Sequence, residues 1–132
     1  EINEKHIFTE DISRFISDLD LNYTKAFIAN KYNYCMPIIN DSCEYSFANI
    51  KQLRHPIIEN IPTSDIYIPN DVSIGGNQQG ILLYGTNAVG KSSLIKAIGI
   101  SVIMAQAGFF VPASGFEFKP YHRWFKRCKS ID

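Results

Sequence analysis

The sequence contains few cysteines and lacks the cysteine spacings of disulfide-rich or zinc-binding domains. Three cysteines occur in 132 residues, and an odd number without close pairs argues against a disulfide framework. No C-x-x-C pair is present, and His122 with Cys128 would supply only two ligands for a zinc ion. We therefore expect reduced thiols and an intracellular protein, whatever its compartment.

The sequence also lacks an excess of charge of either sign. It has 13 basic and 13 acidic residues, so net charge gives no argument for a nucleic-acid-binding surface. Hydrophobic residues make up 45% of the chain and charged residues 20%, which is the composition of a globular protein. The length suits one modest domain with its own core.

No uninterrupted apolar run is long enough to be read as a membrane span. The most apolar window, residues 94–111, contains Lys96, Gln106 and two glycines. It is predicted to be a buried helix followed by a turn, and we expect no membrane association. Residues 1–10 are polar and acidic and do not resemble a signal peptide.

The strongest periodic signal lies near the N-terminus. Between residues 9 and 31, apolar residues recur every three or four positions and define one helix face. Thr9 is the predicted N-cap, with acidic residues in the first turn and lysines toward the C-terminal end, as the helix dipole favours. One helix cannot bury its own apolar stripe, so residues 1–33 are predicted to be a helical connector.

The remaining residues, 34–132, have the pattern of a mixed α/β segment. Residues 34–45 are predicted to be an extended connection, and a helix is predicted over 91–107, closed by Gly108. Pro69 is expected at a sheet edge or a bulge, because proline cannot donate a hydrogen bond to a neighbouring strand. Short strands are predicted around Tyr45 and Phe47, over 66–74, over 81–84, around Phe116 and Phe118, and over 123–128.

A phosphate-binding motif lies between the strand predicted at 81–84 and the helix that follows. Residues 85–92 read GTNAVGKS and satisfy G-x-x-x-x-G-K-[ST] in the strand-to-helix context that this motif requires. Its glycines let successive N–H groups curl around phosphate oxygens, and the helix N-terminus adds its dipole. Lys91 is predicted to reach the β- and γ-phosphates of ATP as the catalytic residue, and the Ser92 hydroxyl to bind Mg²⁺. The predicted nucleotide-binding residues of this loop are Gly85, Thr86, Asn87, Ala88, Val89, Gly90, Lys91, Ser92 and Ser93.

The sequence lacks a second apolar strand ending in a carboxylate, which an ATP hydrolase needs to hold Mg²⁺. After Ser93 no run of four apolar residues precedes Asp or Glu, and the upstream run in PIIND is only two residues long. Glu117 lies in an alternating strand and is predicted to face solvent. The chain is therefore predicted to be part of a longer protein, truncated before the Walker B strand and the signature loop, with little or no hydrolysis of its own.

Three segments in order carry a resemblance to a known family. RHPIIE at 54–59, the phosphate loop, and MAQAGFFVPA at 104–113 resemble the ATPase region of the MutS family of DNA mismatch repair proteins. Residues 16–37 are similar to the helix that connects that family's lever region to its ATPase. The resemblance implies an α/β fold, the N-terminal part of a P-loop NTPase of the ABC type, preceded by a long connecting helix.

The resemblance also implies an ATPase that works as a homodimer or heterodimer of MutS-like subunits. ATP binding and hydrolysis would switch a clamp on mismatched or otherwise structured double-stranded DNA, through regions absent from this chain. In the family an aromatic residue stacks on adenine. The matching position is Tyr67, followed by Ile68, so both are predicted to bind ATP.

Tyr84, Thr86 and Val89 depart from the family's usual loop and indicate a divergent member. One alternative is another ABC-type P-loop ATPase of DNA maintenance, of the SMC or RecF kind. Such a protein should lack the segments at 54–59 and 104–113. A second alternative is a nucleotide-binding dimerisation module that does not hydrolyse ATP.

Overall fold

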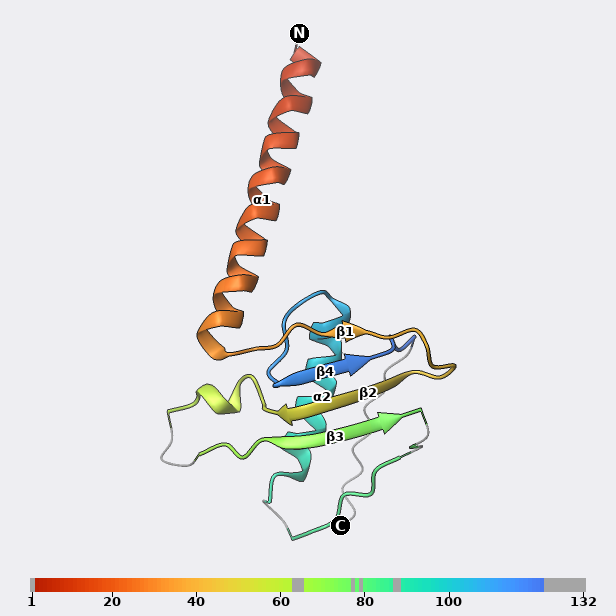
Figure 1. Cartoon of the computed structure of the whole chain (residues 1–132). Coiled ribbons are helices and arrows are strands. Elements are labelled where there is room, and N and C mark those ends of the chain that lie inside the picture. The colour runs from red at the N-terminus through yellow and green to blue at the C-terminus, as the bar shows by residue number, and fades with distance from the viewer. Residues whose placement is uncertain (1, 63–65, 77, 79, 87–88, 123–132) are drawn as a thin grey trace, which may run out of the picture.

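The computed structural model describes residues 2–62, 66–76, 78, 80–86 and 89–122, with side chains from Thr9 onward. A long N-terminal helix leads into a four-stranded mixed sheet, and a second helix lies on one face of that sheet (Figure 1). The chain is thus a small α/β domain, as predicted in outline. Neither of the two described helices is long and apolar enough to cross a membrane.

Helix α1 spans Ile2–Tyr32 and projects away from the sheet (Figure 1). The predicted helix is confirmed, but Thr9 is not its N-cap, because the helix begins earlier and Thr9 lies inside it. Residues 2–8 contain no glycine or proline, so nothing in them opposes continuation of the helix. The helix closes at Asn33, which adopts a left-handed conformation with φ of 54°.

The sheet has the order β1-β4-β2-β3, with β1 parallel to β4 and β2 antiparallel to both of its neighbours. Pro69 directly precedes the edge strand β3, so its predicted position at an edge is confirmed. A short 3₁₀ helix, Ile58–Asn60, lies between β2 and β3. The strands are β1 Ile38–Ile39, β2 Phe47–Leu53, β3 Asn70–Gly75 and β4 Gly115–Phe118.

Helix α2 spans Lys91–Gln106, and Gly108 closes it with φ of 74°, as predicted. The Phe109 N–H donates to the Met104 carbonyl at 2.9 Å, which completes this C-terminal cap. One face of α2 packs on the inner face of the sheet. The core residues are Ala48, Ile50, Leu53, Val72, Phe116 and Phe118 from the sheet, Ala97, Ile98, Val102 and Ala105 from α2, and Val111 and Ala113.

The strand predicted at 81–84 and the solvent-facing position predicted for Glu117 also differ from the structure. The segment 81–84 forms no strand. It is irregular, and its Leu82 and Tyr84 are 86% and 87% exposed. A strand needs a neighbour for its backbone hydrogen bonds, and among the described residues no strand lies beside this segment. Glu117 does not simply face solvent: it is half-buried and accepts a hydrogen bond from Asn40 at 2.6 Å. The strand predicted at 123–128 lies outside the described residues.

Candidate nucleotide-binding site

The loop with the phosphate-binding motif ends at the first turn of α2. Gly90 is the N-cap with φ of 89°, a conformation that side chains with a Cβ rarely adopt. The Leu94 N–H donates to the Gly90 carbonyl at 2.9 Å, while no side chain caps the N–H groups of the first turn. These N–H groups and the helix dipole therefore face the loop, an arrangement that favours a bound anion.

The ammonium group of Lys91 is folded back onto the loop. Its Nζ donates to the Gly85 carbonyl at 2.6 Å and to the Thr86 carbonyl. Neutral carbonyl groups are weaker acceptors for an ammonium ion than phosphate oxygens are, because a phosphate oxygen also carries negative charge that attracts the ammonium ion. Lys91 is thus held beside the loop by two acceptors that an anion can replace.

An open cavity of about 740 Å³ lies between the start of α2 and the segment that precedes β3. Gly90, Lys91 and Ser93 line one side, and Tyr67 and Ile68 line another. The cavity therefore joins a cationic, N–H-rich end to an aromatic and aliphatic end. A ligand with an anionic group and a flat apolar group matches this arrangement.

Tyr67 is half-buried at the apolar end of the cavity. Burial raises the pKa of its phenol, and the negative charge of Glu59 raises it further. The side chain is therefore neutral at physiological pH and presents its ring together with a hydroxyl donor. Such a ring can stack on a planar heterocycle.

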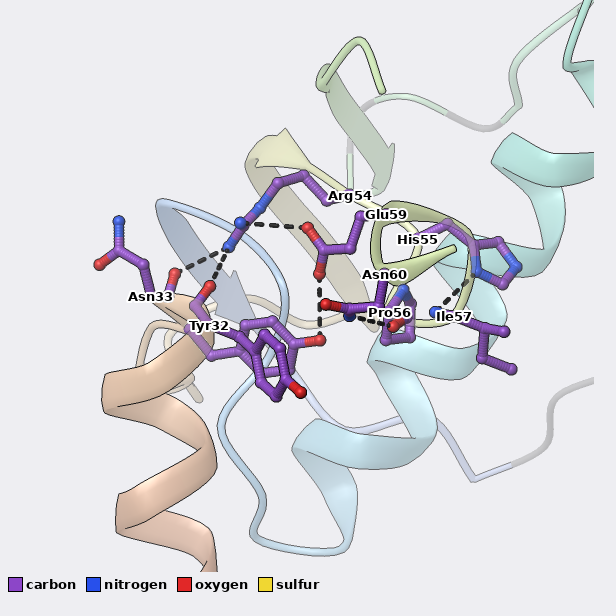
Figure 2. Close-up of polar contacts among 9 residues, drawn as sticks. Tyr32, Asn33, Arg54, His55, Pro56, Ile57, Glu59 and Asn60 are labelled. Carbon is purple, nitrogen blue, oxygen red and sulfur yellow. Dashed lines mark hydrogen bonds and ion pairs between the residues drawn. The ribbon is translucent and has the colours of Figure 1, made fainter. Parts of the chain in front are cut away.

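The segment at 54–59 forms a polar cluster (Figure 2), and Glu59 of this cluster lines the cavity. The Arg54 Nη1 lies 3.1 Å from the Glu59 Oε2, and the Tyr34 hydroxyl donates to the Glu59 Oε1 at 3.0 Å. The Arg54 Nη2 donates to the carbonyls of Tyr32 and Asn33 at 3.1 and 2.8 Å. The cluster thus connects the end of α1 to the wall of the cavity.

His55 is buried within the same segment and caps the 3₁₀ helix. Its Nδ1 accepts the N–H group of Ile57 at 3.3 Å (Figure 2) and that of Ile58 at 3.4 Å. Burial lowers the pKa of the imidazole, and the positive charge of Lys96 lowers it further. A neutral imidazole is required for Nδ1 to accept these hydrogen bonds, so the capping role and the lowered pKa agree.

A family model described as MutS domain V matches residues 81–132. The DNA mismatch repair protein MutS of Cytophaga hutchinsonii is 38% identical over 122 residues, which cover 91% of this chain. The protein of the same name from Chlorobaculum tepidum is 36% identical over 118 residues, or 89% of the chain. The mitochondrial DNA mismatch repair protein mutS homolog of Sarcophyton glaucum is 36% identical over 120 residues, also 89% of the chain.

This chain belongs to the MutS family. The resemblance inferred from the sequence is confirmed by the family model and by relatives that match most of the chain. The chain spans only 12–14% of the length of these three relatives. In a protein as long as these relatives, a segment of this length with its site would form only a small part of the chain.

The structure brings together many of the site residues predicted for this MutS-family chain. Tyr67 and Ile68, predicted from the family resemblance, share the cavity with loop residues Val89, Gly90, Lys91 and Ser93. Gly85 and Thr86 contact the Lys91 ammonium. Ser92, the predicted Mg²⁺ ligand, is exposed and does not line the cavity. Asn87 and Ala88 lie outside the described residues.

Sequence reasoning missed the contribution of Ile58 and Glu59 to the cavity wall. Both belong to the segment that carried the family resemblance, yet they were assigned no role in the site. The available signal was a single acidic residue placed directly after two isoleucines. Among the described residues, no group of three or more His, Cys, Asp or Glu side chains could hold a metal ion.

Proposed function

We propose that this chain binds ATP with Mg²⁺ in the cavity, as part of a MutS-like DNA mismatch repair ATPase. The observation that carries the proposal is the position of Tyr67 across one cavity from Lys91 and the start of α2. A nucleotide has an anionic end and a planar apolar end, which are the two features that the cavity matches. The family membership supports the same ligand.

In this proposal the adenine stacks on Tyr67 and contacts Ile68, while the phosphates lie against the loop and the first turn of α2. Lys91 exchanges the carbonyls of Gly85 and Thr86 for the β- and γ-phosphate oxygens. The Ser92 hydroxyl contributes to a Mg²⁺ ion that takes its other ligands from phosphate oxygens and water, as this ion usually does.

We propose further that the chain binds ATP without hydrolysing it at a useful rate. Glu59 is the only acidic residue among those described that line the cavity, and its carboxylate is already bonded to Arg54 and Tyr34. A hydrolytic site needs a carboxylate free to hold Mg²⁺ and a group that positions the attacking water. In the complete protein, a dimer of MutS-like subunits would use ATP to switch a clamp on mismatched DNA.

Calorimetric titration of the chain with ATP and Mg²⁺ tests the binding proposal. We expect binding by the unchanged chain and a loss of about 100-fold or more in Lys91→Ala, since charge-assisted contacts contribute about 1.5–3 kcal/mol each. Lys96→Ala is the matched control, because Lys96 is exposed on the same helix and does not line the cavity. Equal affinities for the unchanged chain and Lys91→Ala would exclude the proposed phosphate site. Measurable Mg²⁺-dependent turnover by the pure chain would contradict the non-hydrolytic part of the proposal.

A further inference from the structure

The Arg54 side chain binds the C-terminal end of α1. Asn33 ends the helix in a left-handed conformation, and the Tyr34 N–H donates back to the Ala29 carbonyl at 2.9 Å. The carbonyls of Tyr32 and Asn33 lie beyond these bonds, and both accept from the Arg54 Nη2 (Figure 2). A cation at this position also matches the negative end of the helix dipole.

The same guanidinium group holds a wall of the nucleotide cavity. Its Nη1 pairs with Glu59 at 3.1 Å, and the Arg54 and Glu59 side chains are 24% and 11% exposed. The Tyr34 hydroxyl, which comes from the residue after the α1 cap, donates to the other carboxylate oxygen at 3.0 Å. Arg54 and Tyr34 thus connect the end of α1 to Glu59, and Glu59 lines the cavity.

We propose that Arg54 is a positioning residue that couples occupancy of the nucleotide cavity to the attachment of helix α1. The inference rests on the proposed nucleotide-binding function. A ligand in the cavity excludes water beside Glu59, and a charge pair is stronger where water screens it less. Binding therefore tightens the contact of Arg54 with Glu59, which holds Arg54 and Tyr34 in place, and with them the last turn of α1.

The coupling must act in both directions. If nucleotide stabilises the attachment of α1, then loss of that attachment weakens nucleotide binding by the same factor. Other contacts also hold α1 and the residues after it to the domain, among which Lys25 lies over the Phe109 ring at 4.7 Å and Cys35 pairs with Val111. Neither contact touches the cavity, so the Arg54 route can be removed while they remain.

Amide hydrogen exchange of the Tyr34 N–H, followed by NMR with and without saturating ATP and Mg²⁺, tests the coupling. In the unchanged chain we expect nucleotide to slow this exchange about fivefold or more, the lower end of typical coupling strengths. In Arg54→Gln we expect this slowing to disappear and the affinity for ATP to fall by the same factor. The Lys119 N–H, which donates to the Phe47 carbonyl in the sheet, is the internal reference for global opening.

Lys51→Gln is the matched control variant. It breaks the exposed Lys51–Asp71 ion pair of 3.2 Å on the outer surface and should retain the full nucleotide effect. Tyr34→Phe removes a single hydrogen bond to Glu59, so it keeps the test possible if Arg54→Gln does not fold. We expect a smaller nucleotide effect in this variant than in the unchanged chain.

A merely structural role for Arg54 predicts a different result. Its removal would then speed exchange equally with and without nucleotide, and the ratio of the two rates would stay as in the unchanged chain. That result, or faster exchange on nucleotide binding, would overturn the coupling while calorimetry still showed ATP binding. Absence of ATP binding by the unchanged chain would overturn the proposed function and the coupling together.

Discussion

At the scale of single residues, Tyr67 offers the most direct test of how the cavity holds a base. Removing the ring in Tyr67→Ala should weaken ATP binding about tenfold, because stacking of a base on an aromatic side chain contributes about 1–3 kcal/mol. Tyr67→Phe keeps the ring and should retain most of the affinity. Calorimetry with ATP and Mg²⁺ measures both variants.

Inorganic triphosphate serves as the control ligand for Tyr67, since it carries the anionic part of ATP without a base. Its affinity should be the same in Tyr67→Ala and in the unchanged chain, because Lys91 and the start of α2 remain intact. If Tyr67→Ala weakened the binding of triphosphate and of ATP equally, Tyr67 would act by maintaining the fold of the cavity and not by contacting the base.

His55 gives the chain a predictable dependence of stability on pH. Burial lowers its pKa in the folded state below the ordinary value of 6.5, so the unfolded chain binds the extra proton first. The contribution of neutral His55 to the free energy of unfolding is therefore complete above about pH 6.5 and is lost as the pH falls below that value. We expect the midpoint temperature of thermal unfolding to be lower at pH 5 than at pH 7.5, because these two values lie on either side of the transition. Circular dichroism measures this midpoint.

His55→Asn separates this titration from the capping role. The asparagine oxygen can still accept the N–H groups of Ile57 and Ile58, but it does not titrate in this range. From pH 7.5 to pH 5, the unfolding midpoint of this variant should fall by less than the midpoint of the unchanged chain does. His122→Asn, at an exposed position, should keep the original dependence. A fall of the same size in His55→Asn would assign the titration to other groups.

At the scale of elements, the pairing of β2 with β3 depends on Gly75. This residue pairs with Phe47, has φ of 84°, and would place an added Cβ 2.2 Å from the Ser46 carbonyl oxygen. Gly75→Ala should therefore lower the free energy of unfolding by about 2 kcal/mol or more, as measured by urea denaturation. Gly80→Ala is the control, since nothing lies within 4 Å of its added Cβ. A similar loss in both variants would contradict this account.

The elements that were predictable from the sequence are those fixed by local signals. Periodic apolar residues predicted both helices. Gly108 predicted the end of α2, because a left-handed helix cap requires little more than a glycine at that position. Alternation placed β4, whose Phe116 and Phe118 are buried. Each of these patterns is complete within a few residues of the chain.

What could not be predicted depends on partners far away in the sequence. The apolar segment 81–84 has the composition of a strand, but composition does not supply a neighbouring strand. The approach of Tyr67 to Lys91 was inferred from family resemblance alone, since no local pattern joins them. The link from Arg54 through Glu59 to the cavity could not be predicted from the sequence, because it depends on how three separate segments pack.

At the scale of the whole molecule, a continuous stripe of exposed apolar side chains lies along α1. Phe15, Ile16, Leu19, Tyr23 and Phe27 are each more than half exposed and share one face of the helix. An apolar stripe of this kind exceeds the scattered exposed residues that soluble monomers usually carry. Because burial of a leucine side chain contributes about 2 kcal/mol, this face should drive self-association of the chain.

Leu19→Gln and Leu21→Gln form a matched pair that tests this face. The two positions lie about 200° apart around the helix, and only Leu19 belongs to the stripe. Sedimentation velocity over a range of concentrations should show self-association that Leu19→Gln weakens about thirtyfold, which corresponds to the loss of about 2 kcal/mol from one buried leucine. Leu21→Gln should change it little, although Leu21 is also 46% exposed. Equal effects of both substitutions would show that overall apolar content governs association, and a monomer at every concentration would show that the stripe does not bind itself.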